Sequence, residues 1–291
     1  MTTERGAAFV PGHVTAFFSA HPDERPAVAG SRGAGITLTD GVEVTVDIDD
    51  GAAASDDEAA ARLTLDGEPA TIGAVDDVLA ALGVRGDAVR IRLESELPVG
   101  AGFGVSGAAA LGAALAVTDA VDAGRSENEL VRIAHEAEVG RGTGLGDVVA
   151  QARGGVPIRL QPGAPGHGEL DGIPADARIE YVTFGELSTE AVLAGDTTAL
   201  SDAGERALTR VRRDPRLPTL MTAAREFAAR ADLLVPEVAA AIDDVEAAGG
   251  SAAMAMLGRS VFALGTGLSD AGYDPAVCHT HAAGARLVDD R

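Results

Sequence analysis

The sequence contains no lysine. All 23 basic side chains among its 291 residues are arginine. This absence excludes the Walker A lysine of P-loop enzymes, the strand lysine of protein kinases, and a lysine that would hold a Schiff base or pyridoxal phosphate. A phosphate group bound by this chain must therefore be met by backbone amides, arginine, histidine or a metal ion.

Cysteine is scarce, tryptophan is absent and long apolar runs are missing. Cys278 is the single cysteine, which excludes a disulfide framework and a zinc–cysteine site. No segment reaches the roughly 18 consecutive apolar residues of a membrane-spanning helix, and the first residues lack the pattern of a signal peptide. We therefore expect a cytoplasmic protein that is neither secreted nor inserted in a membrane.

Basic side chains are few: the sequence has 23 of them against 45 acidic ones, and the formal net charge is −22. A chain this negative is a poor partner for nucleic acid or for an anionic membrane. Together with the missing lysine, the acid excess is typical of proteins from salt-accumulating halophiles. We therefore expect a halophilic protein without a nucleic-acid or membrane partner.

Hydropathy patterns predict strands and helices in succession. Apolar residues alternate over 42–48 and 89–93, as in strands with one wet face, whereas residues 73–82 and 106–122 have helical patterns. Ser126 and Glu129 form a capping box that opens a further helix through about Gly140. The acidic stretch 47–58 is interpreted as a solvated turn, and the overall order predicts the α+β class.

The segment 161–176 is rich in proline and glycine and predicts a crossover between two parts of the chain. We place the boundary near residue 165, which gives an N-terminal domain of residues 1–165 and a C-terminal domain of residues 166–291. Beyond it we expect a strand around 179–184, a helical region through about 248 and a final strand around 261–264.

The most informative stretch is glycine-rich and spans residues 98–112, between a strand and an alanine-rich helix. Glycine backbone can approach phosphate closely, and the N-terminus of the following helix favours an anion. Gly102, Gly104 and Gly107 also satisfy the G-x-G-x-x-G pattern of dinucleotide-binding folds. Arg90 and Arg92 alternate through the preceding strand, however, and a strand of that fold is buried on both faces, which argues against an oxidoreductase.

The same stretch resembles the nucleotide motif of the GHMP kinase superfamily, with Pro98, Gly102, Gly104 and Ser106 at the matching places. Pro11-Gly12-His13 resembles the opening motif of that superfamily, with histidine where many members have lysine. The third motif is reduced to Ala255-Met256-Leu257-Gly258, which departs from the usual glycine-rich turn. The resemblance implies a two-domain α+β fold with a ribosomal protein S5 domain 2-like N-terminal part, which binds ATP, and a ferredoxin-like C-terminal part, with ATP and Mg²⁺ as cofactors.

Within the superfamily, the segments 30–35, 134–139 and 143–148 are most similar to the archaeal pantoate kinases. That similarity implies ATP-dependent phosphorylation of pantoate to 4-phosphopantoate, a step of coenzyme A biosynthesis, and a homodimer. The open alternatives are another small-molecule acceptor, namely mevalonate, homoserine or shikimate, and a non-catalytic nucleotide sensor of the same fold.

The candidate nucleotide-binding residues lie on the glycine-rich stretch. Ser106, at the start of the helix, can place its hydroxyl near phosphate and Mg²⁺. The resemblance makes Glu138 the carboxylate ligand of the metal, with Glu136 as the neighbour most easily confused with it. The ATP-binding candidates are Pro98, Gly100, Gly102, Gly104, Ser106 and Gly107, and the metal-binding candidates are Ser106 and Glu138.

The remaining candidates would act on the acceptor. Asp147 follows a two-glycine turn, where exposed amides favour its ionised form, and is our candidate catalytic base. His135 lies three residues before Glu138 and can face the same cleft. By resemblance, Arg159, Ser31, Arg32 and His135 bind the substrate. His13, His21, His167, His279 and His281 are interpreted as surface or packing residues.

Overall fold

The computed structural model describes residues 4–48, 62–85, 88–185 and 197–289. Within those residues the chain forms two sheets. The larger sheet has the strand order β12-β1-β2-β5-β3-β4, while β6 pairs with β2 and β7 pairs with β6. Its strands are β1 (Glu4–His21), β2 (Gly30–Ile48), β3 (Leu63–Leu65), β4 (Glu68–Pro69), β5 (Val89–Ser95), β6 (Val156–Gln161), β7 (Glu169–Ile173) and β12 (Arg286–Leu287).

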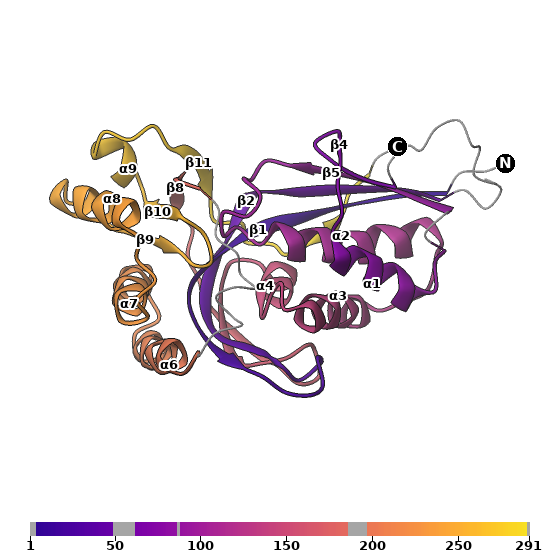
Figure 1. Ribbon diagram of the computed structural model, residues 1–291, viewed down its shortest axis with the longest axis horizontal. Helices are drawn as coiled ribbons and strands as arrows, with labels where there is room; N and C mark the ends of the chain where they lie inside the picture. The colour runs from indigo at the N-terminus through magenta and orange to yellow at the C-terminus, as the bar shows by residue number, and fades with distance from the viewer. Residues whose placement is uncertain (1–3, 49–61, 86–87, 186–196, 290–291) are drawn as a thin grey trace.

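Four helices cover one face of this sheet (Figure 1). They are α1 (Gly73–Leu82), α2 (Val105–Ala120), α3 (Glu127–Arg141) and α4 (Asp147–Arg153). Ser126 caps α3 through the expected capping box with Glu129. Helix α2 is buried along most of its length because small alanine side chains let it pack between the sheet, α1 and α3. This layer places the glycine-rich turn before α2 beside the end of α3.

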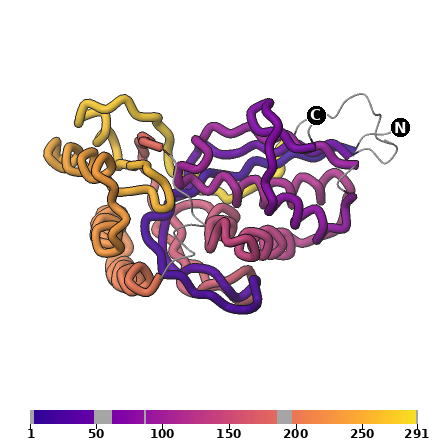
Figure 2. Tube along the Cα trace, in the orientation of Figure 1, coloured from indigo at the N-terminus to yellow at the C-terminus, as the bar shows by residue number. Residues whose placement is uncertain are grey.

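The smaller sheet has the order β11-β8-β10-β9 and lies beside the first part of the molecule (Figure 2). Its elements are β8 (Arg178–Thr183), β9 (Ala252–Ala255), β10 (Ser260–Leu264) and β11 (Ala276–His279), with helices α6 (Thr198–Arg213), α7 (Leu217–Arg230), α8 (Pro236–Ala247) and α9 (Gly267–Asp270). Helices α6 and α7 pack against β1 as well, so β1 spans both parts.

Strand β1 is long and irregular. Its antiparallel register with β2 shifts once between Pro11 and His13 and again between Thr15 and Phe17. Such irregularities bend a strand and re-aim its side chains, and they are frequent beside active sites. His13 and Thr15 lie between the two shifts, at the level of the glycine-rich turn.

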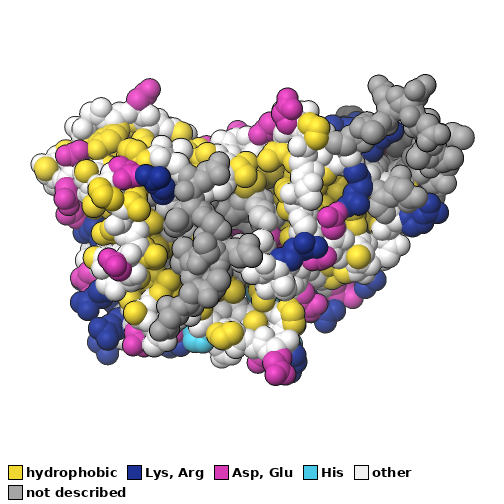
Figure 3. Space-filling view, viewed as in Figure 1, with side chains coloured by type: hydrophobic (Ala, Val, Ile, Leu, Met, Phe, Trp, Pro, Cys, Tyr) yellow, Lys and Arg dark blue, Asp and Glu magenta, His cyan; other side chains and the backbone are white. Residues whose placement is uncertain are grey.

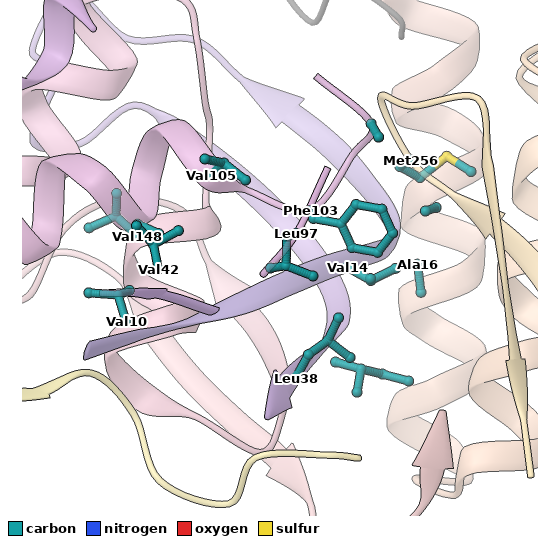
Figure 4. Close-up of a cluster of buried hydrophobic side chains, with 14 of the residues drawn as sticks. Val10, Val14, Ala16, Leu38, Val42, Leu97, Phe103, Val105, Val148 and Met256 are labelled. Atoms are coloured by element: carbon teal, nitrogen blue, oxygen red, sulfur yellow. The ribbon is translucent and has the colours of Figure 1, made fainter. Parts of the chain in front are cut away.

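The core joins the two parts around that turn (Figure 4). Phe103 and Leu97 lie against Val14 of β1, with Met256 nearby, and all four side chains are buried. The Phe103 ring also contacts the Tyr181 ring of β8, with 4.7 Å between centroids. The turn is thereby fixed by aromatic packing from the second sheet as well as by the first.

The α+β class is confirmed, and so are the expected strands at 42–48 and 89–93 and the helices at 73–82 and 106–122. The expectation that the strand at 261–264 is the last one is wrong, because β11 and β12 follow it. Both are short edge strands, four and two residues long, whose apolar alternation is too brief to be recognised.

The change from one sheet to the other lies between Ile173 and Arg178, rather than at the boundary near residue 165. Residue 165 falls in the connection between β6 and β7, which pair with each other. The chain also returns to the first sheet at its end, where β12 pairs with β1. The first sheet is therefore built from both ends of the sequence.

Acidic side chains are spread over both parts of the face shown in Figure 3 rather than gathered in one patch. Asp47, at the end of β2, pairs with Arg92 at 2.8 Å. The rest of the acidic stretch that we interpret as a solvated turn, 49–58, lies outside the described residues. No helix in the described ranges is long and apolar enough to cross a membrane.

Candidate active site

A cavity of about 310 Å³ opens beside the glycine-rich turn, between α2, α3, α4 and the β9–β10 connection. Five of the six predicted nucleotide-binding residues line it; Pro98 precedes the turn and is not a lining residue. The lining members of that set are Gly100, Gly102, Gly104, Ser106 and Gly107. The structure therefore gathers the glycine-rich motif around one hollow.

The backbone of the glycine-rich turn can be approached closely by a ligand. Gly102 has a φ of +92°, and a Cβ atom there would lie 2.9 Å from the Met256 carbonyl oxygen, so a side chain is disfavoured twice. Helix α2 begins at Val105, and the first N–H groups of a helix have no partner within it. Because the first residues of α2 line the cavity, their free N–H groups make the cavity suited to an anion such as phosphate.

Gln151 of α4, which no sequence pattern singled out, donates a 3.0 Å hydrogen bond to the Gly104 carbonyl. The reduced third motif also reaches the turn: a Cβ atom at Gly258 would lie 2.0 Å from the Ala101 carbonyl oxygen. Ser260 donates to that same oxygen at 2.8 Å. The glycine-rich turn is thus held from α4 and from the second sheet.

Ser106 and Glu138 meet in the cavity. The Ser106 hydroxyl donates a 2.6 Å hydrogen bond to Glu138 Oε1. Burial raises the pKa of Glu138 to about 7, although hydrogen bonds from Ser106 and Thr143 oppose the shift. Glu136 instead lies on the exposed face of α3 and pairs with Arg132 at 3.9 Å. Glu138, not Glu136, is therefore the carboxylate at the cavity.

Asp147 opens α4 and lines the same cavity. His13 Nδ1 lies 2.7 Å from Asp147 Oδ1. Burial raises the pKa of Asp147, but the hydrogen bonds from His13 and Thr15 and the positive charge of Arg159 outweigh this effect, so the pKa lies below its usual value. This carboxyl group is therefore an ionised acceptor at neutral pH.

Of the two interpretations of His13, as a surface or a packing residue, the surface one is wrong, because its side chain is fully buried and contacts Asp147. The contact joins residues 134 positions apart. A signal was present in the sequence, since His13 follows Pro11-Gly12 where many superfamily members have lysine. The spacing of histidines alone offered no reason to pair it with Asp147.

Ser31 and Arg159 lie together behind Asp147. Arg159 Nε donates a 3.2 Å hydrogen bond to Ser31 Oγ. A Cβ atom at Gly146 would lie 2.6 Å from both of those atoms, so the backbone just before Asp147 rests on this pair. Arg159 is 2% exposed, and its Nη1 has no hydrogen-bond partner among the described residues.

The other two acceptor candidates have different surroundings. Arg32 follows Ser31 on β2, and its guanidinium bonds to Glu205 at 2.7 Å and to the Leu160 carbonyl at 2.8 Å. His135 is buried, and its Nε2 lies 2.9 Å from the Ala29 carbonyl oxygen, just before β2 begins. The structure thus brings together Ser31 and Arg159, gives Arg32 other partners, and places His135 behind the strand that carries Ser31.

The arrangement is suited to phosphoryl transfer: it has a glycine-rich turn that an anion can approach, a hydroxyl–carboxyl pair at the cavity and an ionised carboxylate. No group of three or more His, Cys, Asp or Glu side chains placed to hold a metal ion occurs in the described ranges. Ser106 and Glu138 nevertheless fit Mg²⁺ bound to a nucleotide, which takes one or two protein oxygens and completes its shell with phosphate and water. A buried carboxyl group with a pKa of about 7 is also one that a neighbouring cation would ionise.

Comparison with known families matches residues 69–155 to the N-terminal domain of the GHMP kinases. The pantoate kinase of Thermococcus kodakarensis is 36% identical over 268 residues, which cover 88% of this chain and 86% of that protein. The pantoate kinase of Methanocaldococcus jannaschii is 31% identical over 260 residues, covering 88% and 91%.

A solved structure described as a phosphotransferase related to the CoA biosynthesis pathway superimposes with a TM-score of 0.85. It is 30% identical in sequence, and the superposition covers 98% of each chain. The similarity therefore extends through both sheets of this chain, beyond the segment of the family domain.

Proposed function

The chain belongs to the GHMP kinase family, and from this premise we propose that it transfers the γ-phosphoryl group of ATP to the primary hydroxyl of pantoate, giving 4-phosphopantoate for coenzyme A biosynthesis. The proposal draws its substrate from the pantoate kinases that this chain resembles. Its independent support comes from the chemistry of Arg159.

The observation that carries the choice of acceptor is the unpartnered Nη1 of Arg159 among the described residues. A buried donor on a cation that lacks an acceptor is costly, and a ligand carboxylate removes that cost with a charge-assisted hydrogen bond. Pantoate has such a carboxylate and a hydroxyl to be phosphorylated. Arg159 and Ser31 would bind the carboxylate, with His135 supporting the strand below; Arg32 is a further candidate for this site.

The nucleotide would lie along the glycine-rich turn, with its phosphates at the start of α2. Mg²⁺ would be held by Ser106 and Glu138, where it supplies positive charge against the phosphates. The turn offers backbone N–H groups, and β1 of the first sheet and Ser260 and Tyr181 of the second fix its position. In this arrangement the protein would stabilise the negative charge of the nucleotide without a lysine.

Asp147 would accept the proton of the acceptor hydroxyl. Its carboxyl group is ionised at neutral pH, lines the cavity and lies next to the Arg159–Ser31 pair through Gly146. A hydroxyl bound between these groups would face both the carboxylate and the phosphates, which is the positioning that phosphoryl transfer depends on.

The test is ADP formation in molar KCl with Mg²⁺-ATP and one acceptor at a time: pantoate, mevalonate, homoserine or shikimate. Pantoate is expected to give the highest kcat/KM. Preference for another acceptor would overturn the substrate while leaving the kinase activity. ATP binding without ADP formation from any acceptor would favour the nucleotide sensor.

We place the reaction in the cytoplasm, where the buried free thiol of Cys278 would remain reduced. A homodimer is proposed from the family resemblance, and sedimentation equilibrium in high salt tests it.

A further inference from the structure

His13 makes the closest side-chain contact with the candidate base. Because a carboxylate oxygen accepts, His13 Nδ1 carries the proton and donates to Asp147 Oδ1 at 2.7 Å. Thr15 donates to the same oxygen at 3.4 Å. Oδ2 of Asp147 accepts no hydrogen bond from the described part of the chain. One oxygen of the carboxylate is thus held, while the other is left for a ligand in the cavity.

The surroundings of His13 favour a neutral ring. Burial lowers the pKa of His13, and the field of Arg159 acts in the same direction, against the hydrogen bond and charge of Asp147. Nε2 is buried without a partner in the described residues, so a second ring proton would have no acceptor. A Cβ atom at Gly35 would lie 2.2 Å from Nε2, which shows that the ring lies tightly against β2.

A neutral donor has a specific advantage at this position. Among the described residues, Arg159 is the one arginine with a fully buried side chain, and it lies in the field of Asp147. A second buried cation beside Asp147 would repel Arg159 and compete with it for negative charge, since charges interact strongly where water is excluded. His13 fixes the carboxylate without adding charge to the site.

We propose that His13 is a positioning residue: its Nδ1–H holds Asp147 Oδ1 as a neutral donor, so that Oδ2 stays available to the acceptor hydroxyl and the charge of Arg159 stays available to the acceptor carboxylate. The assignment rests on the proposed function, because it takes Asp147 as the base. The register of β1 shifts on both sides of His13, and such irregularities re-aim the side chains between them.

The test compares three variants in saturating Mg²⁺ and high salt. His13→Asn keeps an amide N–H near the place of Nδ1–H, whereas His13→Leu removes the donor and retains an apolar side chain. His21→Asn is the matched control, because it changes a histidine on the same strand that contacts Glu205 instead. Both Michaelis constants and kcat are measured with ATP and pantoate, and crystal structures of the His13 variants record the position of the Asp147 carboxylate.

For His13→Leu we expect kcat to fall by about 10- to 100-fold, by analogy with the loss of a hydrogen-bonded partner that orients a metal ligand, with the KM for ATP changed less than threefold. His13→Asn is expected to recover at least a third of wild-type kcat and to keep Asp147 Oδ1 in place. His21→Asn should match wild type.

Equal losses in the Asn and Leu variants with Asp147 unmoved, or no loss in either, would overturn the proposal. If His13→Leu does not fold, His13→Asn decides the question alone. At least a third of wild-type kcat with Asp147 Oδ1 in place supports the proposal, and a larger loss with Asp147 unmoved rejects it. The crystallographic result is independent of turnover, so a wild-type protein inactive on pantoate would overturn the proposed function without deciding the position of Asp147.

Discussion

Ser106 Oγ lies 2.6 Å from Glu138 Oε1, and this hydrogen bond joins the first turn of α2 to the C-terminal part of α3. A hydroxyl and a buried carboxyl group that are far apart in sequence thus form one polar pair at the cavity. The pair has the chemistry of a Mg²⁺ ligand set completed by phosphate.

Glu138→Gln should lower Mg²⁺-dependent turnover by at least about 100-fold, because the amide cannot balance the charge of the cation. Glu136→Gln is the matched control, since that side chain is exposed on the same helix, and it should stay within twofold of wild type. Steady-state rates over a range of Mg²⁺ concentrations measure both. The reverse order of effects would remove Glu138 from the metal site.

Glu138 should also make the metal-free protein less stable at alkaline pH. Its pKa is raised from 4.5 to about 7 in the folded state, so between those values the folded protein binds more protons than the unfolded chain. Stability is therefore highest below the unfolded pKa and falls as pH rises through about 7, by about 3 kcal/mol at most. Urea unfolding of wild type and Glu138→Gln at pH 5 and pH 8 isolates this contribution. A pH dependence shared by both proteins would assign it elsewhere.

Arg159→Ala should weaken acceptor binding. A carboxylate that does not react is held alike in the ground state and the transition state, so the effect falls mainly on KM. A charge-assisted contact of about 1.5–3 kcal/mol corresponds to about a 10- to 150-fold rise in the KM for pantoate. The KM for ATP should barely change.

Arg32→Ala is the comparison for that experiment, because Arg32 already bonds to Glu205 and to the Leu160 carbonyl. Its effect on the KM for pantoate should stay below threefold. A larger rise for Arg32→Ala than for Arg159→Ala would transfer the carboxylate contact to Arg32.

Gly258→Ala should disturb the nucleotide site from the second sheet. The added methyl group would lie 2.0 Å from the Ala101 carbonyl oxygen, so the glycine-rich turn must shift. We expect the KM for ATP to rise at least about fivefold with little change for pantoate. Gly140→Ala places its methyl group in open space on α3 and should leave both constants unchanged. Unaltered ATP kinetics in Gly258→Ala would show that the turn does not depend on this contact.

The net charge of −22 predicts that stability depends on salt. Lowering the salt from 1 M to 0.1 M lengthens the Debye length from about 3 Å to about 10 Å, so the carboxylates repel one another over longer distances. The melting temperature should fall on transfer from 1 M to 0.1 M KCl. An unchanged value would remove the expectation of a halophilic protein.

Local patterns predicted those features that short segments determine. The capping box at Ser126 and the helix after the glycine-rich turn follow from local patterns. The choice of Glu138 over Glu136 came from the family resemblance, and the structure places Glu138 at the cavity. Arg159 and Ser31 were grouped by resemblance, and the structure buries Arg159 beside Ser31.

The features that sequence missed depend on contacts between distant segments. His13 meets Asp147 across 134 residues, and the direction of its side chain depends on the irregular register of β1. Arg32 was grouped with Ser31, but adjacent residues of a strand point to opposite faces of the sheet. Ser31 therefore accepts a hydrogen bond from Arg159, whereas Arg32 donates to Glu205.

The pairing of β12 with β1 has a consequence for the order of events on the ribosome. Ala8 is synthesised 279 residues before its partner Leu287. At about 5–20 residues per second the outer edge of β1 stays open for tens of seconds. An open strand edge invites pairing with other chains. The nascent chain is therefore exposed to misassociation until β12 arrives, and the net negative charge of the chain would help to keep such unfinished chains apart.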